Sequence, residues 1–384
     1  AVWGTKWTGA NLVDMAMITN ARACIVNNAT LASVSFAAIW SEIYIAHQED
    51  DDIQLDASFH QHSGGGRGAL VESYGAVFTS DVGKAVAMSA GTHFAPDAAT
   101  VEIFAQHLLD GQRWMLTPSG TWDYSVMGRS NSGPSMLGVP EVWADLALAL
   151  PVQKNRSREV LDFAALLRGE ADAPSGPTGN KMFWCSDYMV HRTTARTNVS
   201  MVATLRMYSN RTIAARCVNM QGRHNQHSAD GVLNLFFGDA RGGNAAAHPL
   251  TGDAYYDITP VRDPRRLPGV TCETNATLLA CNSVESYNAW PEEMPGTPFV
   301  GGASDGVSGT AAMHLESGTM SKKGANIFSA DGTIIVMGAE LTCNSSSELR
   351  TTLASRILPR GARVHVGRSG EAGRLVPLGG VEKI

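Results

Sequence analysis

Hydrophobic residues in the first part of the chain recur with the spacing of helices. In the stretch NLVDMAMITNARACIVN, apolar side chains stand at Leu12, Met15, Ile18 and Ile25, with small residues between them. This pattern predicts a helix that is packed on both sides.

A second helix is predicted within PDAATVEIFAQHLLDG, where Asp97 is a start signal and Gly111 a stop signal. Val101, Phe104 and Leu108 form one apolar stripe between them. The stretches PEVWADLALAL and SREVLDFAALLRG continue the helical pattern. No alternation of strands with helices occurs here, which disfavours a nucleotide-binding doubly wound sheet.

The apolar period changes after a turn-rich stretch, RGEADAPSGPTGN, which predicts a linker at residues 168–180. Beyond it, NVSMVATLRMYS, GVLNLFFG, GTAAMHLES, GTIIVMGAEL and ARVHVG alternate with a period of two and are separated by turn residues. We therefore predict an α+β multidomain protein, with a helical domain at residues 1–167 and a large antiparallel β-sandwich at residues 181–384.

Composition and charge exclude several classes of protein. Charged residues make up 17% of the chain and the net charge is −6, which fits neither a disordered tail nor a general nucleic-acid surface. No apolar run approaches the roughly 20 residues that span a bilayer, so we expect no membrane partner. The start, AVWGTKW, has no signal region, and we expect a chain that is processed or that is part of something longer.

The cysteines and sequons favour an extracellular protein. The six cysteines include no CxxC pair, so a thiolate zinc site is disfavoured. Cys272 and Cys281 are close enough in sequence for a local disulfide, whereas we expect Cys24, Cys185, Cys217 and Cys343 to be buried free thiols. N-x-S/T sequons occur at Asn28, Asn155, Asn198, Asn210, Asn275 and Asn344. Together these features predict a secreted protein.

The stretch LDASFHQHSGGGRGALVESYG concentrates candidate catalytic side chains. A zinc site is disfavoured because the spacing of His60 and His62 sends them to opposite faces, and a GxSxG nucleophile motif is absent. A glycosidase would use two carboxylates, for which Asp56 and Glu72 qualify by residue type alone. Proton abstraction next to the carboxylate of a uronic acid needs an amide or cation, a base and an acid, and it needs no metal.

Several motifs, taken in order, resemble polysaccharide lyase family 8, the hyaluronate, chondroitin AC and xanthan lyases. They are TGANLVDMAMI, LDASFHQH, SYG, GRSNS, SNRTIAARCVNMQG, ADG, DPRRLPGVT, FVGGASDG and SKKGANIFSADGTIIVMGAEL. The resemblance spans nearly the whole chain. It implies an incomplete N-terminal α/α toroid that carries the catalytic cleft, followed by the β-sandwich.

The resemblance also assigns catalytic roles. Asn11 matches the asparagine that binds the substrate carboxylate, although a helix cap is an ordinary role for such a residue. His62 and Tyr74 match the catalytic histidine and tyrosine, the tyrosine being base and then acid. Arg129 matches an arginine that holds the substrate, and a nearby cation favours phenolate.

Further substrate contacts are predicted at Trp7, Gln61, Arg67, Asn131, Arg216 and Asn219. Trp7, with Trp3, forms either a sugar-stacking wall or ordinary core packing. Arg216 and Gln221 stand where the family usually has glutamates, Gly133 stands in place of a second arginine, and a glycine run lengthens the segment from His62 to Tyr74. An arginine in place of a glutamate favours a more highly charged polymer or accompanies lost activity.

The sequence therefore predicts a secreted, monomeric lyase that cleaves an acidic, uronic-acid-containing polysaccharide by β-elimination without a metal or other cofactor. The alternative is a carbohydrate-binding protein on a decayed lyase scaffold, which the Arg216 and Gly133 departures favour.

Overall fold

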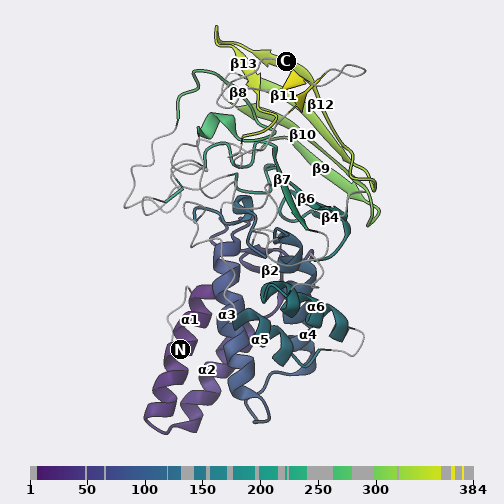
Figure 1. Ribbon diagram of the computed structural model, residues 1–384. Coiled ribbons are helices and arrows are strands. Elements are labelled where there is room, and N and C mark those ends of the chain that lie inside the picture. Colours follow the sequence, from purple (N-terminus) through teal and green to yellow (C-terminus); the bar gives the residue numbers. More distant parts are fainter. Residues whose placement is uncertain are drawn as a thin grey trace.

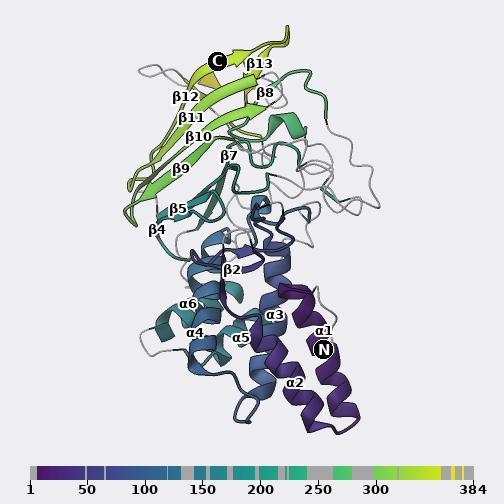
Figure 2. The same cartoon turned by 180° about the vertical axis from the view of Figure 1, so that it is seen from behind.

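The structure, a computed structural model, describes residues 7–47, 50–64, 66–118, 120–130, 142–152, 156–170, 176–194, 199–214, 221–222, 225–239, 263–278, 297–317, 320–355, 365–367 and 374–375. Helices fill one end of the molecule and β-sheets the other (Figure 1). The view from behind shows the same division (Figure 2). The predicted order, a helical part followed by an antiparallel sheet part, is confirmed.

The first part of the chain contains a group of helices that pack against one another. They are α1 (Gly9–Ile25), α2 (Ala29–Ser41), α3 (Glu72–Ser89), α4 (Ala98–Gln106), α5 (Val142–Ala149) and α6 (Ser157–Leu167). The contacts of α1 with α2 and α3, and of α3 with α5, build one layered bundle. Among the described residues, no helix has both the length and the apolar content needed to cross a membrane.

Helix α1 forms where the sequence predicts it, but it buries a different face from the one expected. Its buried positions carry mostly small side chains, such as Ala16 and Ala23, which let α2 and α3 approach closely. Met15, Ile18 and Ile25 are exposed instead. The prediction of packing on both sides is therefore wrong for the described structure.

Helix α4 begins as predicted, because the Asp97 side chain accepts a hydrogen bond from Thr100 N at 2.8 Å. Val101, Phe104 and Leu108 are all buried, which confirms the predicted stripe. The helix does not simply stop at Gly111. It changes into a π-helical turn at His107–Gly111 and then a 3₁₀ turn at Gln112–Met115.

Two four-stranded antiparallel sheets dominate the second part of the chain. One has the order β4-β5-β6-β7, and the other has the order β12-β11-β10-β9. Their strands are β4 (Gly179–Phe183), β5 (Tyr188–Thr194), β6 (Val199–Arg206), β7 (Val232–Asp239), β9 (Phe299–Ser304), β10 (Gly309–Ser317), β11 (Met320–Phe328) and β12 (Ile334–Cys343). The strand pairs β8 (Thr271–Glu273) with β13 (Leu349–Thr351) and β14 (His365–Val366) with β15 (Arg374–Leu375) complete this part.

A small sheet lies between the helices and the sandwich. It consists of β1 (Ile45–Ala46), β2 (Asp52–Gln54) and β3 (Phe59–His60), with β1 parallel and β3 antiparallel to β2. Strand β3 leads directly into the HQH motif, so this sheet sets the starting point of the candidate catalytic loop.

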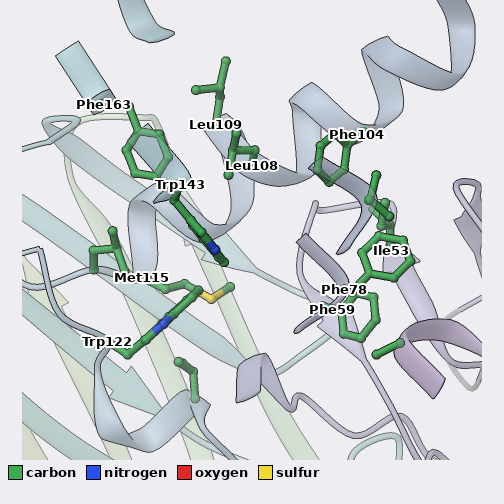
Figure 3. Close-up of a cluster of buried hydrophobic side chains, with 14 of the residues drawn as sticks. Ile53, Phe59, Phe78, Phe104, Leu108, Leu109, Met115, Trp122, Trp143 and Phe163 are labelled. Carbon is green, nitrogen blue, oxygen red and sulfur yellow. The ribbon is translucent and has the colours of Figure 1, made fainter. Parts of the chain in front are cut away.

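One hydrophobic core runs from the helices into the first sheet. Figure 3 shows Phe59 beside Phe78 and Trp122 beside Trp143 in the helical part of this core. The same cluster includes Phe183, Val202 and Phe236 from strands β4, β6 and β7. The two parts therefore share buried apolar area.

The cysteine predictions are only partly confirmed. Cys185 is a buried free thiol, as expected, but Cys24 is exposed and Cys343 is half-buried. Cys272 is also free, with its Sγ 3.6 Å from His227 Nε2, so the predicted bridge from Cys272 is wrong for this structure. Cys217 and Cys281 lie outside the described residues.

Candidate active site

The structure brings His62, Tyr74 and Arg129 together at the boundary between the helices and the sandwich. The rings of His62 and Tyr74 meet edge to face, with their centroids 4.8 Å apart and an interplanar angle of 88°. Arg129 donates a hydrogen bond from Nη2 to the Tyr74 hydroxyl at 2.7 Å, and its guanidinium carbon lies 5.3 Å from the centre of the tyrosine ring. The Tyr74 phenol thus has an imidazole against its ring and a cation at its hydroxyl.

Tyr74 is placed by the start of α3. The helix begins at Glu72, whose buried carboxyl group accepts a hydrogen bond from Phe59 N at 3.1 Å and so ties α3 to β3. Tyr74, in the first turn, is only partly buried and packs against Ala69, Val71 and Ile213. Because Ile213 belongs to the sandwich part, the ring sits where the two parts meet.

His62 and Arg129 are held by unusual backbone geometry. His62 has a φ of +60°, a left-handed conformation that few side-chain-bearing residues adopt. Arg129 follows Gly128, which has the same φ and whose carbonyl oxygen accepts a hydrogen bond from Asn225 Nδ2 at 2.8 Å. A Cβ atom at position 128 would lie 2.8 Å from Val71 Cγ1, so glycine fits there for two reasons.

Gln221, which in sequence is only a departure from the family pattern, contacts a site residue. Its Oε1 accepts a hydrogen bond from Arg129 Nε at 3.0 Å. Arg129 therefore spans from Tyr74 in the helical part to Gln221 in the sandwich part. The one sequence feature that points to this contact is that Gln221 stands where the family usually has a glutamate.

Asn11 lies in the first turn of α1, where its side chain is partly exposed. The neighbouring Ala10 N donates a hydrogen bond to Gln61 Oε1 at 3.1 Å, so the start of α1 is adjacent to the HQH motif. Its predicted role as carboxylate ligand stays a prediction.

Gln61 has a different position from the one predicted. Only 1% of its surface is exposed, and its amide is occupied by Ala10 N, Asp51 Oδ2 and Thr8 O. A buried amide with these partners holds the protein together and presents no group to a polysaccharide. The predicted substrate contact at Gln61 is therefore corrected to a structural role.

Arg67 also makes an internal contact. Its Nε and Nη2 donate to the Thr212 carbonyl oxygen at 2.9 and 2.6 Å. Beside it, Gly68 N donates to Arg211 O, and Ile213 N donates to Gly68 O. The glycine-run loop that lengthens the segment from His62 to Tyr74 thus fastens the helical part to the sandwich, where the sequence predicted a substrate contact.

The alternative catalytic groups are buried. His60, unlike His62, points inward, and its Nε2 lies 2.9 Å from Ser186 Oγ. Asp56 accepts hydrogen bonds from Ser58 and from Cys185 N, and Glu72 is fully buried. Burial raises the pKa of Glu72 to about 8. Two enclosed carboxylates do not face a cleft as a glycosidase pair requires, so the structure argues against the hydrolase reading.

The other predicted contacts are less defined. Trp7 is half exposed, as a stacking residue would be, and its role stays a prediction. Asn131, Arg216 and Asn219 lie outside the described residues, as do Trp3 and Gly133. No group of three or more His, Cys, Asp or Glu side chains suited to a metal ion occurs in the part of the chain that the structure covers.

Comparison with known proteins assigns the family. Residues 2–151 match the sequence profile of the polysaccharide lyase family 8 N-terminal alpha-helical domain, and residues 178–375 match that of its super-sandwich domain. The chain belongs to polysaccharide lyase family 8. Among relatives in this family, the chain is 27% identical over 352 residues to the chondroitinase-AC of Pedobacter heparinus, covering 91% of this chain and 46% of that one. It is 22% identical over 396 residues to a hyaluronate lyase of Enterococcus faecalis, covering 91% and 36%.

Solved structures of chondroitin AC and xanthan lyases have a similar fold. A chondroitinase AC lyase solved as oligosaccharide complexes superposes with a TM-score of 0.73 at 25% identity, over 94% of this chain and 51% of that one. A chondroitin AC lyase of Streptomyces coelicolor in complex with chondroitin sulphate also gives 0.73, at 21% identity, over 93% and 51%. A xanthan lyase of Paenibacillus gives 0.68 at 18% identity, over 91% and 34%. The chain thus spans about half or less of the length of these relatives.

Proposed function

We propose that this chain carries the catalytic centre of a polysaccharide lyase that cleaves a glycosaminoglycan-like, uronic-acid-containing polymer by β-elimination. The observation that carries the proposal is the hydrogen bond of 2.7 Å between Arg129 Nη2 and the Tyr74 hydroxyl, with His62 against the same ring. The chondroitinase and hyaluronate lyase relatives support an acidic polysaccharide as substrate.

The proposed reaction removes the C5 proton of the uronate and breaks the bond between C4 and the glycosidic oxygen. Asn11 binds the carboxylate of the sugar, so that negative charge developing at C5 and on the carboxylate is stabilised. Tyr74, as phenolate, accepts the C5 proton while His62 assists, and the phenol then returns a proton to the departing oxygen. The products are a new hydroxyl end and a C4–C5 double bond in the uronate.

Arg129 has two functions in this proposal. Its positive charge stabilises the phenolate of Tyr74 through the hydrogen bond already present. It also attracts an anionic polymer, because neither of the two described hydrogen bonds of its guanidinium goes to a carboxylate. We further propose a secreted, monomeric enzyme, as the sequons and the polymeric substrate favour.

The proposal is tested by ultraviolet absorbance of 4,5-unsaturated uronate during incubation with hyaluronan, chondroitins, alginate, glucuronan and xanthan. We expect absorbance to grow with at least one glycosaminoglycan. Tyr74→Phe and His62→Ala should lower the rate by at least about a hundredfold, because each removes a proton-transfer group. Chelation with EDTA should leave the rate unchanged.

Other outcomes overturn the proposal in distinguishable ways. Polysaccharide binding without the chromophore supports the alternative of a carbohydrate-binding protein. New reducing ends without the chromophore indicate hydrolysis. Full activity in Tyr74→Phe would remove the phenol from the mechanism.

A further inference from the structure

A polar cluster, of which Gln61 is buried and the other members are half-buried, lies beneath the start of α1, beside the candidate site. We call Gln61, Asp51 and Glu42 the α1 brace. Gln61 Oε1 accepts from Ala10 N at 3.1 Å, while its Nε2 donates to Asp51 Oδ2 at 3.0 Å and to Thr8 O at 3.4 Å. The Gln61 amide thus joins the chain on both sides of Gly9 to the segment that carries His62.

The two carboxylates of the α1 brace complete the connection. Asp51 Oδ2 accepts from Thr8 Oγ1 at 3.0 Å, and Asp51 Oδ1 accepts from Ser63 N at 2.8 Å. Glu42 Oε2 accepts from Gly9 N at 2.6 Å. Helix N-termini leave their first N–H groups without partners inside the helix, and here side chains from other segments supply those partners. Negative charge is also favourable at this end of a helix.

The backbone of α1 approaches the α1 brace closely. Gly9 has a φ of +54°, and a Cβ atom there would overlap Gln61 Oε1 and lie 2.9 Å from Asp52 Oδ1. No larger residue fits between the helix start and the Gln61 amide without moving one of them. The start of α1 and the Gln61 amide are therefore in close van der Waals contact, which fixes the distance between them.

The residues that the α1 brace holds are direct neighbours of two candidate catalytic residues. Ala10 precedes Asn11, and Gln61 and Ser63 flank His62 on both sides. We propose that Gln61 and Asp51 are positioning residues that fix Asn11 relative to His62, so that the group binding the uronate carboxylate and the imidazole act on one sugar ring. This inference rests on the proposed lyase function, which it deepens.

The experiment compares Gln61→Met with a matched control. The substitution keeps the length of the side chain and removes both the acceptor for Ala10 N and the donor to Asp51. We expect kcat to fall by about tenfold to a hundredfold with KM nearly unchanged, because misplacing a catalytic group costs rate even when binding persists. The control is Asn28→Ala, which removes the N-cap of α2 (Leu31 N to Asn28 Oδ1, 2.9 Å) at the opposite end of the α1–α2 hairpin. It should lower stability comparably and leave kcat unchanged.

A double-mutant cycle separates positioning from general destabilisation. In an Asn11→Ala background the group to be positioned is gone, so adding Gln61→Met should lower kcat by less than about twofold. Multiplicative losses in the double variant, or an unchanged kcat in Gln61→Met, would overturn the proposal.

Hydrogen exchange keeps the test independent of activity. Exchange of the Ala10 and Ser63 amides should accelerate in Gln61→Met and stay unchanged in Asn28→Ala. If the parent protein forms no unsaturated product, the proposed function fails while this measurement still decides whether the α1 brace exists. Unchanged exchange at Ala10 in Gln61→Met would eliminate the α1 brace itself.

Discussion

In the described part of the chain, Arg129 donates hydrogen bonds to the Tyr74 hydroxyl and to the Gln221 amide, and neither is a carboxylate. A guanidinium that is hydrogen-bonded to an amide keeps more of its charge for an approaching anion than one that is paired with a carboxylate. At the scale of residues, we therefore expect Gln221 to govern how strongly the proposed site attracts a polyanion.

Gln221→Glu should raise KM for a glycosaminoglycan by about tenfold at low salt, because a carboxylate would then pair with Arg129 and repel the polymer. Steady-state kinetics at increasing ionic strength provide the measurement, and the difference from the parent should shrink as salt screens the charge. Gln221→Ala, which removes the hydrogen bond without adding charge, is the control and should have a smaller effect on KM. An equal effect of the two substitutions would show that charge is not the cause.

Glu72 makes stability depend on pH. Burial raises its pKa to about 8 from an ordinary value of 4.5, so the folded protein keeps a proton that the unfolded chain has released at neutral pH. Stability contributed by this group is therefore lost as pH rises from 4.5 towards 8. Burial raises the pKa of Asp52 to about 8 as well, which acts in the same direction.

Glu72→Gln should reduce this dependence. Between pH 6.5 and 8, the free energy of unfolding should fall less steeply in the variant than in the parent, by up to about 1.4 kcal/mol per pH unit. Urea unfolding at several pH values measures both slopes. Parallel slopes would mean that Glu72 is already ionised in the folded state.

The sequence predicted part of this site. His62, Tyr74 and Arg129 were found because each stands in a short motif, and the structure brings the three together. The contacts of Gln61 and Arg67 were not predictable, because their partners Ala10 and Thr212 are far away in sequence. An amide or guanidinium next to a catalytic motif has the same appearance in sequence whether it faces a substrate or the interior.

At the scale of elements, the π-helical turn after α4 is explained by close packing. Gly111, at the end of the turn, packs against the carbonyl group of Ala57, and a Cβ atom at position 111 would overlap Ala57 O. His107, at its start, is buried with Nδ1 3.0 Å from the same oxygen. The turn widens the helix where the chain before β3 presses against it.

Gly111→Ala should therefore lower the free energy of unfolding by about 1–3 kcal/mol, the usual cost of forcing atoms into a packed interior. Chemical denaturation measures the change. Gly64→Ala is the control, since its Cβ would meet nothing within 4 Å, and it should be nearly neutral. An unchanged free energy of unfolding in Gly111→Ala would show that the segment around Ala57 moves aside at little cost.

Helices and strands were predicted correctly where the apolar period agreed with the residues that start or end an element. The strand within GTAAMHLES was found as β10, and the Asp97 start of α4 was confirmed. The exposed face of α1 was assigned wrongly because large apolar residues were expected to be buried, whereas its small residues make the contacts. The small sheet β1–β3 was missed because strands of two or three residues carry no periodic signal.

At the scale of the whole molecule, a buried polar cluster joins the two parts alongside the shared core. Asp123 accepts hydrogen bonds from Tyr188 Oη at 2.9 Å and from Asn234 Nδ2 at 3.1 Å, and Tyr124 Oη donates to Asn234 Oδ1. Because buried polar groups are costly without partners, this cluster requires both parts to be in place.

Tyr188→Phe should lower the free energy of unfolding by about 1–3 kcal/mol, since it removes a donor from a buried carboxylate. Amides of α3 and of β6 should lose protection against hydrogen exchange by the same amount, because the two parts unfold as one unit. Loss of protection confined to β6 would show that the helices and the sandwich unfold separately.

The shared hydrophobic core limits how the helical and sandwich parts can be exchanged between relatives. It joins Phe59 and Phe78 of the helical part to Phe183, Val202 and Phe236 of the first sheet. A chimera that joins these helices to the sandwich of a distant relative would place unmatched side chains against each other, leaving voids or clashes. Exchange of whole parts between relatives, as a way to change substrate preference, therefore requires that the core residues on both sides of the boundary come from the same parent. Residues of the surrounding loops can be changed one at a time.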